Sequence, residues 1–324
     1  MRIFSKLFAA RVWQWILLLS VAAGSLFIGV ADVSLSDIFF ADSERLGIFL
    51  VSRVPRLCSV LVAGSSLAIS GLIMQRITRN RFVSPTTAGT MEWCRLGVMA
   101  AIIAFPDSPA ILRVFAAFAV SLFGTWLFLS FVSRIEARSI AVVPLVGMML
   151  GGVVNAASTF FAYQYDVVQN VASWLQGNFS LIIYGNYELL YLSVPFMVAA
   201  YLYADKFTVA GMGKDAATSL GLNHAGVVRV GLAIVSLVSS ITIVEAGNIP
   251  FVGLIVPNIV GMFKGDNVKN ILFDTAWLGA FLVLLCDVAG RLVLFPYEVP
   301  IGVILSVIGS AAFLALLLRR KLHA

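Results

Sequence analysis

Charged side chains inside long apolar stretches are the first residues of this sequence that could do chemistry. Asp287 and Arg291 stand four residues apart with the acid first, the favourable order for an ion pair on one helix face. Glu92 and Arg95 stand three apart and could pair likewise. Because ionisable groups are costly inside a membrane, each is a candidate functional residue, and a purely structural ion pair is the alternative.

Other familiar chemistry is missing from the sequence. Gly211-Met-Gly-Lys214 resembles the end of a phosphate-binding loop, but that motif needs glycine where Thr208 stands and Ser or Thr where Asp215 stands. Two histidines and three cysteines without ligand spacing offer no metal site. No helix carries the series of Asp, Glu and His that a proton relay uses. We expect this chain to bind no cofactor or metal and to catalyse no reaction itself.

Membrane-spanning helices are the elements that must position these residues. Of the 324 residues, 60% are hydrophobic and 12% are charged, and the mean hydropathy is +1.00. Soluble domains carry about 25% charged residues. The composition therefore excludes a soluble enzyme, a nucleic-acid-binding domain and a disordered chain, and it predicts contact with membrane lipid.

The apolar runs predict an all-α, polytopic membrane protein with about ten transmembrane helices in a single domain, 1–324. The first run is too long for the apolar part of a signal peptide, so we interpret it as an uncleaved helix. The predicted spans are 12–31, 55–74, 88–105, 110–132, 140–161, 189–204, 227–245, 251–264, 271–291 and 300–318.

The distribution of basic residues predicts the orientation. If the N-terminus is inside, most of the 22 Lys and Arg residues fall in inner segments. The outer segments and helix ends hold only Arg45, Arg53, Arg56, Arg113 and Arg291. Positive charge is retained on the cytoplasmic side. We therefore expect a multi-pass protein of the bacterial cytoplasmic (inner) membrane with both termini in the cytoplasm.

Two long connections and one broken segment stand out. The outer segment, about 162–188, contains Trp174–Asn178 and predicts a short helix at the outer surface. The inner loop, about 205–226, is polar and Gly-rich, and is either a docking surface or a plain connector. Gly and Pro interrupt 245–258, a reasonable place for a constriction in a transport pathway. Glu298 precedes Pro300 and is predicted to cap the last helix.

Several stretches, in order, resemble the permeases of iron-siderophore and vitamin B12 ABC importers. The resemblance runs from about residue 50 to the C-terminus. It rests on Arg53–Arg56, Gly71–Gln75, Arg79–Asn80, Ser84–Pro85 with Gly89, Ser219–Asn223, Gly247–Pro257, Asp287 with Arg291, Glu298–Gly302 and Ile308–Gly309. It implies the type II ABC importer permease fold.

The resemblance also implies partners and roles. Two permeases would combine with two cytoplasmic ATPase subunits, which hold ATP and Mg, and with an extracytoplasmic siderophore-binding protein. By position, Arg53, Arg56 and Arg291 would meet acidic residues of that binding protein. The residues that would couple to the ATPase are Gly213, Asp215, Ser219, Leu220, Gly221, Leu222 and Asn223. The pathway or structural motif residues would be Gly71, Gln75, Asn80, Pro85, Gly247, Pro250, Gly253, Pro257, Asp287 and Glu298.

Departures from the family pattern bear on the substrate. The stretch Ser84–Met91 (SPTTAGTM) is similar to that of permeases for catechol-type siderophores such as petrobactin and anguibactin, which often work with a second, different permease. It predicts a ferric catecholate siderophore and a heterodimer, with a homodimer still open. The alternatives are import of another iron chelate, haem or vitamin B12, or an ion-coupled secondary transporter of a small metabolite.

Overall fold

The computed structural model describes residues 11–29, 43–85, 89–132, 142–185 and 187–321, and the regular elements in this part of the chain are all helices. Its only β-type pairing is one isolated antiparallel bridge between Leu294 and Tyr297. Among the described residues, four helices are long and apolar enough to cross a membrane, at Leu46–Ile77, Val146–Gln164, His224–Ala246 and Val268–Leu292. The all-α membrane fold is confirmed, and the number of crossings remains a prediction.

The helices follow the predicted spans closely. In chain order they are α2 (Arg11–Phe27), α4 (Ser43–Ile48), the π-helix η1 (Phe49–Arg53), α5 (Val54–Ile77), α6 (Thr90–Ala104), α7 (Ala110–Val132), α8 (Val142–Gln164), α9 (Val168–Leu175), the 3-10 helix η3 (Glu188–Leu192), α10 (Ser193–Leu202), α11 (Ala204–Ala210), α12 (Lys214–Ser219), α13 (His224–Ala246), α14 (Val252–Lys264), α15 (Val268–Leu292) and α16 (Ile301–Lys321). The short outer helix predicted within 162–188 is α9, and the inner loop contains α11 and α12.

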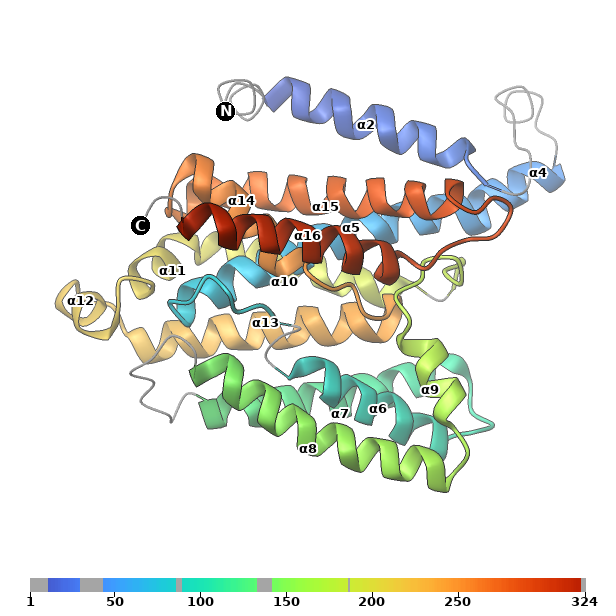
Figure 1. Ribbon diagram of the computed structural model, residues 1–324, viewed down its shortest axis with the longest axis horizontal. Helices are drawn as coiled ribbons and strands as arrows, with labels where there is room; N and C mark the ends of the chain where they lie inside the picture. The colour runs from blue at the N-terminus through green and yellow to red at the C-terminus, as the bar shows by residue number, and fades with distance from the viewer. Residues whose placement is uncertain (1–10, 30–42, 86–88, 133–141, 186, 322–324) are drawn as a thin grey trace.

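Helix α5 is the centre of the bundle. It packs against α13, α14 and α15, and most of its second half is buried. The long helices run side by side between two ends of the molecule, with α12 at one end and α9 at the other (Figure 1). Helix α2 lies along the edge of the bundle, where Val12 and Trp13 are largely exposed. Residues far apart in sequence therefore meet at each end.

The predicted break between the seventh and eighth spans is present. Helix α13 ends at Ala246, and Gly247 follows with φ of 74°. A side chain on Gly247 would lie 2.6 Å from the carbonyl oxygen of Gln176, so the turn needs glycine for space as well as for conformation. The chain resumes as α14 at Val252.

Two glycines let α5 and α14 touch backbone to backbone. A Cβ atom on Gly71 would lie 1.8 Å from the carbonyl oxygen of Gly253, a distance at which the helices must separate. Small residues allow such approaches between membrane helices. Gly71 and Gly253 are thus packing residues at the centre of the fold.

We expect Gly71→Ala to destabilise the protein by roughly 1–3 kcal/mol, because the added methyl group overpacks a fixed contact. Gly152→Ala in α8 is the matched control, since nothing lies within 4 Å of its Cβ position. Thermal unfolding of the detergent-solubilised variants measures the difference. Equal melting temperatures for the two variants would contradict the packing role of Gly71.

Candidate functional site

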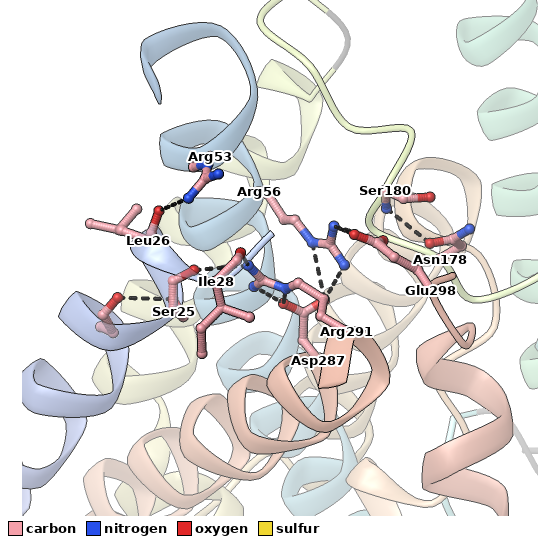
Figure 2. Close-up of polar contacts among 11 residues, drawn as sticks. Ser25, Leu26, Ile28, Arg53, Arg56, Asn178, Ser180, Asp287, Arg291 and Glu298 are labelled. Carbon is pink, nitrogen blue, oxygen red and sulfur yellow. Dashed lines mark hydrogen bonds and ion pairs between the residues drawn. The ribbon is translucent and has the colours of Figure 1, made fainter. Parts of the chain in front are cut away.

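Five charged residues converge at the end of the bundle opposite α12, and we name them the arginine cluster: Arg53, Arg56, Asp287, Arg291 and Glu298 (Figure 2). Arg56 donates from Nη2 to Asp287 Oδ1 at 2.9 Å and from Nη1 to Glu298 Oε2 at 2.9 Å. Arg291 binds the other oxygen of Asp287, with its Nε at 3.1 Å from Oδ2. One buried carboxylate is thus shared by two guanidinium groups.

The same arginines hold the end of α2. Arg291 Nη1 donates to the carbonyl oxygens of Ser25 and Ile28 at 2.8 and 2.9 Å. Arg53 Nη1 donates to the carbonyl oxygen of Leu26 at 2.6 Å. The last carbonyls of a helix lack partners within it and carry partial negative charge, so two guanidinium groups satisfy them well. The cluster therefore fastens α2 to α5 and α15.

The structure brings Arg53, Arg56 and Arg291 together, and their contacts in it are with groups of this same chain. Their exposed side-chain fractions are small: 12% for Arg56 and 6% for Arg291. Arg53 is also buried. The predicted pair of Asp287 and Arg291 on one helix is confirmed. Glu298, which was predicted to cap the last helix, accepts from Arg56 through both oxygens of its carboxylate.

The second predicted helical pair, Glu92 with Arg95, is wrong. Arg95 Nη1 donates instead to Asn155 Oδ1 of α8 at 2.6 Å. Glu92 Oε2 is buried and has no hydrogen-bond partner within the described chain. Spacing on one helix suggested the pair, but the neighbouring helix supplies a better partner for the guanidinium group.

The motif residues in the middle of the bundle join α5 to the break before α14. Gln75 Nε2 donates to the carbonyl oxygen of Leu254 at 3.1 Å. Gly253 lies against Pro85: a Cβ atom added to Gly253 would be 3.2 Å from Cδ of Pro85.

On the other side of the break, the backbone amide of Asn248 donates to the carbonyl oxygen of Leu175 at 3.0 Å. Pro257 lies inside α14 and is buried. The neighbouring residues 86–88, part of the substrate-related motif, lie outside the described residues.

The predicted coupling segment forms α12 and the turn into α13. Gly213 and Gly221 have φ of 114° and 76°, conformations that favour glycine on each side of this short helix. Asn223 caps α13, with its Oδ1 accepting from the Gly226 amide at 3.0 Å. Leu220 is 66% exposed, so an apolar side chain stands free at this end of the molecule. Asp215 lies in the first turn of α12.

Ion pairs close the end of the bundle that carries α12. Asp266 accepts from Arg76 and Arg81, each at 2.8 Å. Partial burial alone would raise the pKa of Asp266, but the Arg76 hydrogen bond and the charges of both arginines lower it below the usual value. Asn80 supports this turn by accepting from the Phe82 amide at 2.9 Å. The α14–α15 connection is thereby held against the end of α5.

One buried charge network escaped the sequence analysis. Asp274 in α15 is 4% exposed, and its Oδ2 accepts from Lys264 at 2.7 Å. Its Oδ1 accepts from Gln14 of α2 at 2.9 Å. An acid inside the predicted span 271–291 was a usable signal, but its partners lie on other helices, α14 and α2. In the described part of the chain, no group of three His, Cys, Asp or Glu residues could hold a metal ion.

The fold and its long apolar helices define a multi-pass helical membrane protein. Comparison with known proteins is more specific: residues 16–319 match the model of the FecCD transport family. The chain belongs to this family, and its role is that of a transport subunit. The resemblance in the sequence is thereby confirmed.

Individual relatives cover nearly the whole chain. It is 50% identical to the petrobactin import system permease protein YclN of Bacillus subtilis (strain 168), over 96% of this chain and 99% of that one. It is 38% identical to the ferric-anguibactin transport system permease protein FatD of Vibrio anguillarum, over 93% and 96%. An inward-facing structure of a metal-chelate type ABC transporter matches with a TM-score of 0.78 at 26% identity, over 94% and 96%. The type II ABC importer permease fold is therefore confirmed.

We expect Arg291→Ala to destabilise the protein by roughly 3–5 kcal/mol, because it leaves one side of a buried carboxylate and two α2 carbonyls without their donor. Lys269→Ala, in the same helix α15, removes an exposed ion pair with Asp205 of α11 and should leave stability unchanged. Thermal unfolding in detergent compares them. A wild-type melting temperature for Arg291→Ala would show that α2 is held by other contacts.

Proposed function

We propose that this chain is the permease subunit of an ATP-driven importer that moves a ferric siderophore of the catecholate type into the cytoplasm, from the periplasm or the cell exterior. The observation that carries the proposal is the 50% identity, over 96% of the chain, with a petrobactin import permease. The similarity to a ferric-anguibactin permease points to the same kind of substrate. The catecholate assignment also draws on the Ser84–Met91 motif.

ATP hydrolysis belongs to a separate ATPase chain in this proposal. The Gly213-Lys214 sequence lacks the remainder of a phosphate-binding loop. Helix α12 with the exposed Leu220 is instead a surface onto which an ATPase can pack, through the coupling residues Ser219–Asn223. The start of α2 and the end of α16 lie at the same end of the molecule as α12 (Figure 1), which supports a cytoplasmic location for both termini.

A second permease completes the pathway. The α8 span is only 22% buried within this chain, and its exposed side chains include Met148, Met149 and Val153. Lipid or a partner permease must cover this apolar face. We favour a different permease as the partner because of the Ser84–Met91 motif, and a homodimer is the alternative that isolation of the complex would reveal.

Purification of the tagged chain from native membranes tests these partners. We expect it to recover an ATPase and a second permease, and the complex with its binding protein should import a ferric catecholate into vesicles only with ATP.

Replacing Ser219–Asn223 by a Gly/Ser linker of equal length should abolish uptake, because the ATPase contact is lost. The matched control places the same kind of Gly/Ser linker at residues 105–109, an exposed connection between α6 and α7, and should leave uptake unchanged. Uptake driven by an ion gradient without ATP would support a secondary transporter instead.

We place the docking of the binding protein at the arginine cluster. Arg291 and Arg53 are buried in contacts with α2. Glu298 is 26% exposed and Arg56, which it binds, is 12% exposed, so a docked protein would reach Arg56 by displacing Glu298. An acidic residue of the binding protein would compete with Glu298 for Arg56.

This competition makes a testable prediction. Glu298→Gln should strengthen binding of the binding protein severalfold, because it frees one side of Arg56, and Arg56→Gln should weaken it. Both effects should grow at low ionic strength, where charges are screened less. Binding to the purified permease in detergent measures them. Unchanged affinity in both variants would remove the arginine cluster from the docking surface.

A further inference from the structure

Helix α5 ends in a turn that usually carries glycine. Thr78 caps the helix, and the amide of Asn80 donates to the carbonyl oxygen of Gln75 at 3.1 Å. This bond is typical of the Schellman motif, in which the residue after the cap is left-handed and most often glycine. Here that residue is Arg79, with φ of 52°. A long cationic side chain therefore stands where the backbone favours none.

The guanidinium group of Arg79 lies against the predicted coupling segment. A Cβ atom added to Gly213 would be 3.1 Å from Nη1, 3.4 Å from Cζ and 3.9 Å from Nε of Arg79. Gly213 directly precedes α12 and has φ of 114°, so a side chain there would be strained as well as crowded. The Arg79 side chain thus occupies the space that this glycine leaves open.

A second contact joins the same two segments. A Cβ atom on Gly211 would lie 3.5 Å from the carbonyl oxygen of Arg76, an ordinary van der Waals distance. Met212, between the two glycines, is 58% exposed. The turn that leads into α12 therefore rests on the last residues of α5, while its apolar side chain stays accessible from outside.

On its other side, Arg79 continues into a loop that is fixed to α14. The carbonyl oxygen of Arg81 accepts from Asn258 Nδ2 at 2.7 Å. Pro85 lies against Gly253 in the first turn of the same helix. Movement of the chain at Arg79 would therefore act on α14, next to the helix break.

The position of Arg79 does not favour stability. The residue is exposed, and its left-handed backbone costs free energy that a glycine would not. Strain of this kind persists where the surrounding structure imposes it, and it gathers at functional sites. Coupling between distant sites travels through packed side chains and rigid elements. A strained residue that joins the coupling segment to the end of a central helix is suited to that task.

We propose that Arg79 is a positioning residue that transmits a movement of α12 to α5 and α14. When an ATPase displaces α12, the guanidinium group carries the displacement to the end of α5, and the loop after it carries the displacement to α14. The inference rests on the proposed function, because α12 moves only if an ATPase acts on it. It adds the contact through which that movement enters the bundle.

Arg79→Gly is the informative variant, because glycine suits the left-handed turn and the variant should melt at or above the wild-type temperature. We compare it with the wild type in vesicles that contain the whole importer. It should hydrolyse ATP at the wild-type basal rate but import roughly fivefold less ferric catecholate per ATP hydrolysed, because the link to α12 is lost. Wild-type uptake per ATP in Arg79→Gly would overturn the inference.

Asp166→Gly is the matched control. Asp166 follows α8 with φ of 53°, and the amide of Val167 donates to the carbonyl oxygen of Ala162 at 2.9 Å, so the same kind of turn carries another exposed, charged residue. The connection between α8 and α9 lies at the end of the molecule opposite α12 (Figure 1). Asp166→Gly should leave uptake per ATP unchanged. A loss equal to that of Arg79→Gly would overturn the inference.

Two further measurements distinguish a contact within the chain from a contact with the ATPase. The tagged Arg79→Gly chain should recover as much ATPase as the wild type, and lower recovery would show that Arg79 binds the ATPase directly, against the inference. Arg79→Lys keeps a long side chain beside Gly213 and should restore part of the uptake per ATP. A lysine variant as uncoupled as Arg79→Gly would rule out the packing contact as the link.

Failure of the proposed function has a different signature. If no ATPase accompanies the wild-type chain, the proposed function fails, and this inference fails with it. If the wild-type importer hydrolyses ATP but does not import the ferric catecholate, only the substrate assignment fails. Stimulation of hydrolysis by the binding protein then replaces uptake as the readout: Arg79→Gly should abolish it and keep the basal rate, and wild-type stimulation would overturn the inference.

Discussion

Asp287 is the buried charge on which the half of the structure opposite α12 depends. It is 2% exposed and is stabilised by two guanidinium groups that approach its two oxygens from different helices. Arg291 also reaches the end of α2, and Arg56 also reaches Glu298 before α16. In a membrane, where water cannot satisfy a charge, such a network holds only if all its members are present. Four segments distant in sequence are thereby joined at one point.

Close backbone contacts serve the same purpose in the middle of the bundle. Lipid provides no hydrophobic force that drives helices together, so tight packing through small residues must do so. The contact of Gly71 with Gly253 brings α5 against α14, and that of Gly64 with Gly279 brings α5 against α15. Because Gly253 lies in the first turn of α14, its contact with Gly71 also holds the helix break beside α5.

The two ends of the molecule differ in a way that suits a transporter. At one end, the arginine cluster is largely buried and is tied to α2. At the other, Asp266 and its two arginines are more exposed, and α12 carries a free apolar side chain. Between them, Glu92 keeps an acceptor oxygen without a donor beside a strained backbone.

The sequence by itself determined the membrane class, the helix positions, the broken segment at 247–257 and the family, because apolar run length, glycine and proline act locally. It also predicted the Asp287–Arg291 pair, whose members share one helix. It missed the partners of Asp274, misassigned Arg95, and did not foresee that Glu298 would bind Arg56. Only the tertiary structure decided those contacts, because each joins residues from different segments of the fold. A charge buried in a membrane takes whichever donor packing brings closest, and sequence separation does not measure that distance.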